Sequence, residues 1–238
     1  METLKSTCIS RVLCHITIVS ATPVVFFISL YIAKLHSIFL ALLPTLLVYP
    51  PYLSFVKKRK LLEASILVLE WAFMLSLAMI AATLLYGEGI GNLVIRGEAY
   101  KEEMFLWIKT GYGPEGDPSL FMAPKIKEII IFSLAGFISV GFLALLMGGI
   151  LLNYMNYYVG SLLLHANPGA FFTIALLAWP IYAILRVPGY IFLGTVLTRI
   201  SYVLIKKRKL MLEPEAKKLL YYAFILIILD FVLKGTIA

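Results

Sequence analysis

The stretch KKRKLLEASILVLEWAFMLSLAMIAATLLYG, residues 57–87, places four consecutive cations directly before a long apolar run. A helix needs about 20 mainly apolar residues to cross roughly 30 Å of hydrocarbon, and residues 61–87 are enough for that. A second basic tetrad, Lys206-Lys207-Arg208-Lys209, follows another apolar run. Basic residues beside a span are typical of the cytoplasmic loops of membrane proteins. The pattern therefore predicts a chain that crosses a membrane as helices.

The composition of the whole chain agrees with this prediction. Its 238 residues are 61% hydrophobic and 14% charged, whereas soluble domains carry roughly 45–50% apolar and about 25% charged residues. The net charge of +8 includes the two tetrads beside apolar runs, and that placement argues against a nucleic-acid partner. We therefore expect one all-α, polytopic domain over residues 1–238, with the lipid bilayer of the cell membrane as its solvent.

Amide side chains are scarce in the chain. It contains no glutamine and four asparagines. Depletion of thermolabile amides is a trend in thermophilic proteins, although a membrane composition lowers the amide content as well. The composition thus agrees with a thermophilic source.

The apolar runs predict about seven transmembrane helices, or six if the short fifth and sixth runs are counted differently. The predicted spans are residues 12–33, 37–56, 61–87, 129–152, 170–185, 190–205 and 217–234. Arg186-Val187-Pro188-Gly189 separates the fifth span from the sixth and is expected to form a turn. Residues 88–128, between the third and fourth spans, are the long hydrophilic segment of the sequence.

Placing both tetrads in the cytoplasm sets the orientation of every span. The N-terminus is then cytoplasmic, whereas the 88–128 loop and the C-terminus are extracytoplasmic. The acidic residues agree with this arrangement, since many of them lie in that loop. They are Glu88, Glu98, Glu102, Glu103, Glu115, Asp117 and Glu128.

Ionisable residues lie inside several predicted spans. Glu70 lies about 15 Å beyond Lys60, and Arg199 lies about 10 Å before Lys206, at 1.5 Å per helical residue. Such groups cost roughly 2.5–3.5 kcal/mol each on insertion scales and normally face a partner inside the bundle. Because the depths match and the charges are opposite, we expect Arg199 to pair with Glu70 or with Glu63.

The last predicted span contains Asp230 one turn before Lys234. This spacing predicts a pair on a single helix. Intramembrane charges of this kind either hold spans together as static contacts or form a relay or substrate site. Near the ends of spans they also reach the interface by snorkelling.

A run of asparagine and tyrosine, residues 153–158, follows the fourth predicted span. On a helix Asn153, Asn156 and Tyr157 share a face, which suits a polar ligand or a lipid headgroup; the alternative is an interfacial aromatic belt. Together with the charged residues, the asparagines make up a candidate intramembrane polar site. Its members are Glu63, Glu70, Asn153, Asn156, Arg199 and Asp230.

The 88–128 loop contains a second candidate site. Residues 99–109 place Tyr100, Met104, Trp107 and Ile108 on one helical stripe, which predicts a short amphipathic helix on the outer surface. Turn-forming residues follow it. The acids of this segment either bind a cation or a partner, or are part of a solvated loop. The candidate outer-loop residues are Glu102, Glu103, Glu115 and Asp117.

Small residues at helical spacing lie in the fourth predicted span. Gly141, Ala144 and Gly148 fall on one face, and small residues let helix backbones approach closely in lipid. This face packs either within the chain or against another chain, in a homo- or hetero-oligomer.

No zinc, nucleotide or serine-nucleophile motif is present in the sequence, and three scattered histidines make a poor metal site. We therefore expect no cofactor and favour a non-enzymatic role. The leading hypothesis is a small transporter or channel-like bundle for a small solute or lipid, based on intramembrane charges and on prolines inside spans. The alternatives are a non-catalytic subunit or assembly factor of a membrane complex, and a membrane-embedded enzyme acting at the outer face.

Overall fold

The computed structural model describes residues 11–115, 117–208 and 212–237, and these ranges contain helices and no strand. Two short 3-10 helices, η1 (Glu88–Leu93) and η2 (Pro168–Ala170), lie in the connections. The α-helices are α1 (Arg11–Ile32), α2 (Phe39–Lys57), α3 (Leu61–Tyr86), α4 (Gly97–Thr110), α5 (Pro118–Ile138), α6 (Phe142–Leu164), α7 (Phe171–Leu177), α8 (Ile181–Lys207) and α9 (Pro214–Ile237).

Six helices of the described chain are long and apolar enough to cross a membrane, namely α1, α2, α3, α6, α8 and α9. Their outward faces carry large apolar side chains, among them Val24 and Ile28 of α1 and Phe224 and Ile228 of α9. Such faces are stable in hydrocarbon and not in water. The predicted all-α, polytopic membrane fold is therefore confirmed.

The bounds of the fourth predicted span were wrong. Residues 129–152 straddle a break, because α5 ends at Ile138 and α6 begins at Phe142. In the turn between them Val140 and Gly141 have φ of 54° and 90°, the left-handed region that ends a helix. Hydropathy does not register this break, since the residues on both sides of it are apolar.

Helix α5 begins inside the segment that was predicted to be an outer loop. Asp117 starts it by accepting a hydrogen bond from the backbone N–H of Ser119, at 2.8 Å. One face of α5 carries Lys125 and Glu128 toward other helices, while Ile126 and Ile130 are exposed. Because its charged residues lower its mean hydropathy, the sequence suggested a loop here.

The predicted fifth span and the turn after it were also wrong. Only Phe171–Leu177 forms a helix in the first part of residues 170–185, because Pro180 disfavours helix at the residue before it. The expected turn at Arg186–Gly189 lies inside the continuous helix α8, with Pro188 within it. Arg186 marks a buried ion pair rather than a loop.

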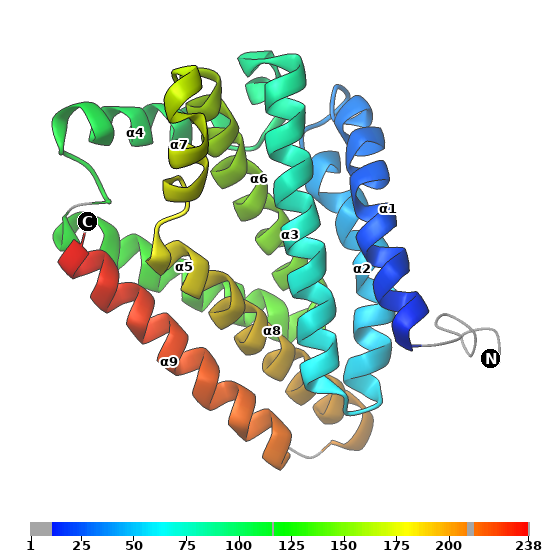
Figure 1. Ribbon diagram of the computed structural model, residues 1–238. Helices are drawn as coiled ribbons and strands as arrows, with labels where there is room; N and C mark the ends of the chain where they lie inside the picture. Colours follow the sequence, from blue (N-terminus) through cyan, green and yellow to red (C-terminus); the bar gives the residue numbers. More distant parts are fainter. Residues whose placement is uncertain (1–10, 116, 209–211, 238) are drawn as a thin grey trace.

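Contacts along the helices fix their relative directions. Asn156 bonds Ser76, and Gly160 packs on Thr83, so α6 runs parallel to α3. Helix α6 starts at the end of the bundle where α3 starts. The chain therefore returns from the end where α3 finishes, and α5 is the long helix of this return. Figure 1 shows α8 and α9 side by side, oblique to α1, α2 and α3. The polar helix α5 thus packs against α6, α8 and α9, beside the six apolar helices of the described residues.

Both basic tetrads flank helix ends that meet at one end of the bundle. The Arg199 guanidinium donates to the carbonyl oxygen of Val56 at 3.1 Å, and Glu213 lies 3.3 Å from Arg59. The start of α1 lies at this same end, since Arg11 pairs with Glu63 at 3.2 Å. Because α9 runs antiparallel to α8, its last residues lie away from the tetrads, as Figure 1 shows.

The small-residue face is used largely within the chain. Gly141 precedes α6, and a Cβ on it would lie 2.2 Å from the Thr198 hydroxyl of α8. The Cβ of Ala144 lies 3.0 Å from the place where a Cβ on Gly136 would stand. Gly148 alone of the three meets no side chain. An oligomer through this face stays a prediction.

We expect reporters at the two termini to lie on opposite sides of the membrane. With the tetrads in the cytoplasm, a green fluorescent protein fused to the C-terminus should be dark in a bacterial host, whereas an alkaline phosphatase fusion there should be active. The N-terminal fusions are the matched control and should give the reverse. A fluorescent C-terminal fusion would contradict the orientation, while equal readings at both ends would contradict the placement of the termini on opposite sides of the membrane.

Candidate functional site

A partly open cavity lies between α3, α5, α6 and α8, with about 740 Å³ of empty space that includes space open to the surroundings. Its wall is mainly apolar and includes Phe132, Leu145, Leu151 and Ile191. Three of its lining residues are charged, Lys125, Glu128 and Arg186. Largely apolar cavities with a few convergent polar groups are the usual form of small-molecule sites. We therefore take this cavity as the candidate site.

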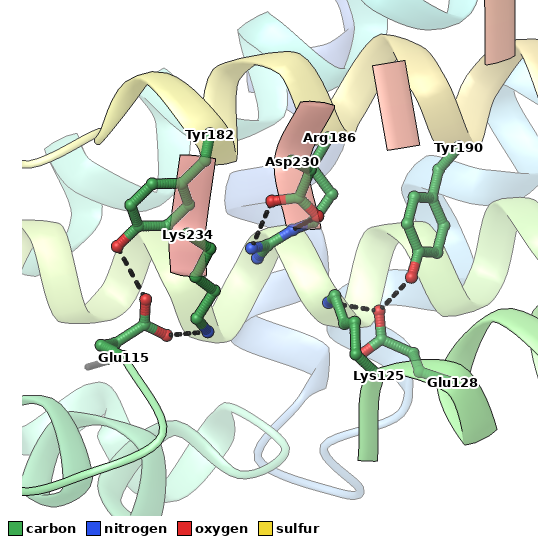
Figure 2. Close-up of polar contacts among 8 residues, drawn as sticks. All are labelled: Glu115, Lys125, Glu128, Tyr182, Arg186, Tyr190, Asp230 and Lys234. Atoms are coloured by element: carbon green, nitrogen blue, oxygen red, sulfur yellow. Dashed lines mark hydrogen bonds and ion pairs between the residues drawn. The ribbon is translucent and has the colours of Figure 1, made fainter. Parts of the chain in front are cut away.

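The charged side of the cavity begins with a contact group on α5. Lys125 donates to Glu128 Oε1 at 2.7 Å, one helical turn later on the same helix. The hydroxyl of Tyr190, from α8, donates to the same oxygen at 2.9 Å. The Lys125 ammonium also lies 5.6 Å from the centre of the Tyr190 ring. Figure 2 shows these three side chains converging from the two helices.

A bidentate ion pair joins α8 to α9 beside this group. Arg186 donates from Nε and Nη2 to the two carboxylate oxygens of Asp230, both at 2.8 Å. The fork-to-fork geometry is the strongest arrangement of such a pair. Asp230 is 2% exposed, so its buried negative charge is compensated by the Arg186 guanidinium rather than by water. The predicted pairing of Asp230 with Lys234 on one helix was therefore wrong.

Lys234 instead pairs with a residue from the loop before α5. Its ammonium donates to Glu115 Oε1 at 2.9 Å, and the Tyr182 hydroxyl donates to Glu115 Oε2 at 2.8 Å. Burial raises the pKa of Glu115, but the adjacent Lys234 ammonium and the two hydrogen bonds outweigh it and hold the pKa below its usual value of 4.5. Glu115 is therefore ionised at neutral pH.

The spacing of residues on two helices brings these groups together. Tyr182, Arg186 and Tyr190 recur every four residues on one stripe of α8, and Asp230 and Lys234 do the same on α9. Figure 2 shows the resulting row of contacts. The Tyr-x-x-x-Arg-x-x-x-Tyr spacing was a usable signal, but interpreting Arg186 as part of a turn concealed it.

A second cavity, of about 340 Å³, adjoins the first one. It lies under α4 and the connection before α8, where Tyr100, Trp179 and Tyr182 line it. Met155 and Arg186 line both cavities. These two residues separate the first cavity from the second, which lies nearer α4.

The expected pairing of Arg199 was wrong. Its guanidinium donates to Glu213 Oε1 at 2.7 Å and to Oε2 at 3.1 Å, across the connection from α8 to α9. Glu70 instead pairs with His15, whose Nδ1 lies 2.6 Å from Glu70 Oε2. Arg199 and the two acids expected to pair with it have similar depths along their helices, but the helices do not bring these side chains into contact. Neither Arg199 nor Glu70 lines the cavity.

The two asparagines lie in the interior but outside the cavity wall. Asn156 donates to the Ser76 hydroxyl at 2.9 Å and accepts from the Trp179 indole at 3.1 Å. Asn153 is 3% exposed, and its Oδ1 has no donor among the described residues. Asn156 therefore links α3, α6 and the connection before α8. Glu63, the remaining member of the predicted intramembrane site, contacts Arg11 and Lys60.

The four outer acids do not converge on one place. Asp117 is used as the cap of α5, Glu115 is buried against Lys234, and Glu102 is exposed on α4. Glu103 lies on α4 as well, without an ion pair among the described residues. The predicted amphipathic helix is confirmed in α4, where Met104 is buried and Tyr100 packs on Tyr154.

Comparison with protein-family models, with curated proteins and with solved structures gives no match for this chain.

We expect replacement of Glu115 by glutamine to destabilise the folded protein at neutral pH. Removing one partner of a buried pair costs about 3–5 kcal/mol, because the other charge is left uncompensated. Since the pKa of Glu115 is lowered in the fold, its contribution is complete above pH 4.5 and is lost as the pH falls further. Thermal unfolding in detergent should therefore separate the wild type from E115Q at neutral pH and bring them together in acid.

The exposed residue Glu102 provides the matched control. E102Q should unfold at the same temperature as the wild type at both pH values. A difference between the wild type and E115Q that persists unchanged into acid would show that the glutamine acts through packing and not through the charge.

Proposed function

We propose that this chain is a small membrane transporter for a lipid-like amphiphile, which it holds in the cavity between α3, α5, α6 and α8. The single observation that carries the proposal is the composition of the cavity wall, apolar over most of its area with three charged residues on one side. An amphiphile matches that division, because its chain contacts the apolar wall and its head contacts the polar side.

A small polar solute fits this cavity less well. Transfer of a polar group from water into an apolar site without compensating hydrogen bonds costs roughly 2–7 kcal/mol. The charged residues are confined to one side of the wall, so a solute that is polar all round would leave its other polar groups against apolar side chains. Of the two solute classes expected from the sequence, lipid is therefore favoured.

Two features of the helices support movement rather than static storage. Pro124 precedes Lys125 in α5, and Pro188 lies two residues after Arg186 in α8. Each proline removes a backbone hydrogen bond and weakens its helix locally. Interrupted helices beside a binding site are a recurrent feature of transporters. In the proposed orientation, in the cell membrane, the second cavity lies on the extracytoplasmic side of the first.

The proposal is tested by filling the cavity. Gly148 lines it, and a Cβ there meets nothing, so a leucine occupies space without a clash on its own helix. In proteoliposomes, transbilayer movement of NBD-acyl lipids with zwitterionic heads and with uncharged sugar heads, read by dithionite quenching, should slow on the order of tenfold or more in G148L, because the leucine takes up space that the lipid chain would fill and about 1.4 kcal/mol of lost binding corresponds to a factor of ten. Thermal unfolding of G148L should stay close to that of the wild type.

The matched control introduces leucine at Gly89, which also has no neighbour within 4 Å but lies in η1 outside the cavity. G89L should move both kinds of lipid at the wild-type rate. Movement of both kinds no faster than in protein-free vesicles, or equally fast in G148L and the wild type, would overturn the proposed function.

A further inference from the structure

A tryptophan of the cavity lining has an indole donor without an acceptor. Trp71 of α3 lines the cavity and is 1% exposed, and its buried Nε1–H has no hydrogen-bond partner among the described residues. A buried donor without a partner is unfavourable, and buried indole N–H groups usually find one. An acceptor that belongs to a ligand would satisfy it.

The charged side of the cavity also has donors to spare. Both hydrogen bonds of Arg186 leave from Nε and Nη2, which leaves its Nη1 without an acceptor in the part of the chain described here. Lys125 donates one bond, to Glu128, although an ammonium group carries three N–H groups. Three different helices thus offer donors to whatever occupies the cavity.

The charges around the cavity are already balanced. The contact groups combine three cations with three acids, and each cation has its own carboxylate. A ligand with a net charge would add an ion without a partner in a site of low dielectric, and the penalty for a buried ion is several kcal/mol. Surplus donors together with balanced charge call for acceptor atoms on an uncharged head.

We propose that the cavity selects amphiphiles whose head is uncharged and carries oxygen acceptors, such as the ester, carbonyl and hydroxyl oxygens of an acylglycerol. The inference rests on the proposed function and adds the class of head to it. The acceptors receive hydrogen bonds from Trp71 on one wall and from Arg186 and Lys125 on the other. The selectivity comes from the charge balance, and the affinity of the head comes from the donors.

The test compares three ligands with an eighteen-carbon unsaturated chain and different heads. Monoolein is uncharged, oleyl sulfate is a permanent anion and oleyltrimethylammonium is a permanent cation. Binding of each radiolabelled ligand to the detergent-solubilised full chain is measured by scintillation proximity. Monoolein should bind on the order of tenfold or more tightly than either ion, since 1.4 kcal/mol corresponds to a factor of ten.

Two variants connect this preference to the residues. W71F keeps an aromatic ring but loses the donor, and it should weaken the binding of monoolein about fivefold, which corresponds to one hydrogen bond. W107F is the matched control. It removes an indole from α4 away from both cavities and should leave the affinity for monoolein unchanged. E128Q removes one negative charge at nearly constant size, and should shift the preference toward oleyl sulfate.

The outcomes separate the two proposals. If none of the three ligands binds the wild type more tightly than G148L, the proposed function itself fails. If ligands bind in the cavity but oleyl sulfate or oleyltrimethylammonium equals monoolein, the uncharged-head inference fails and the proposed function stands. A W71F protein that binds monoolein as the wild type does would remove Trp71 from the head site.

Discussion

The arrangement of the polar helices depends on one requirement, that a charge removed from water must have a partner of opposite charge. Arg186 is half of a bidentate pair, and the carboxylate that completes it comes from α9. In the opposite direction, Lys234 of α9 binds Glu115 in the loop that leads into α5. These two contacts connect α5, α8 and α9 into one unit. They hold α8 and α9 side by side, as Figure 1 shows, since separating the helices would leave both ions without partners.

The class of fold was predictable because hydropathy is summed over whole helices. Helix bounds were predictable where a basic tetrad marks the end of a span, as at Lys57, and not where two apolar helices meet at Gly141. Helix α5 shows the opposite failure, since Lys125 and Glu128 lower its hydropathy while its other face exposes large apolar side chains such as Ile126 and Ile130. A charged residue in a sequence is compatible with an exposed loop and with a buried ion pair. Only the position of its partner in the fold distinguishes the two.

The candidate site was predictable only in part, because its members are brought together by folding. Arg186 and Asp230 are 44 residues apart, and Glu115 and Lys234 are 119 apart. Matching depth alone suggested that Arg199 contacts Glu70, but depth says nothing about which helices are neighbours. Of the predicted site residues, Asp230 and Glu115 belong to the contacts beside the cavities. Arg199 and Glu63 connect helix ends near the basic tetrads instead.

The order of these partners along the chain has a consequence for biogenesis. During synthesis α5 and α8 enter the membrane before α9 exists, so Glu115 and Arg186 lack their partners until α9 leaves the ribosome. The insertion machinery has to shelter these ions, or water has to follow them, until α9 is in place. A product that stops before α9 would keep the earlier apolar helices but carry unpaired charges, which is the kind of defect that membrane quality control removes.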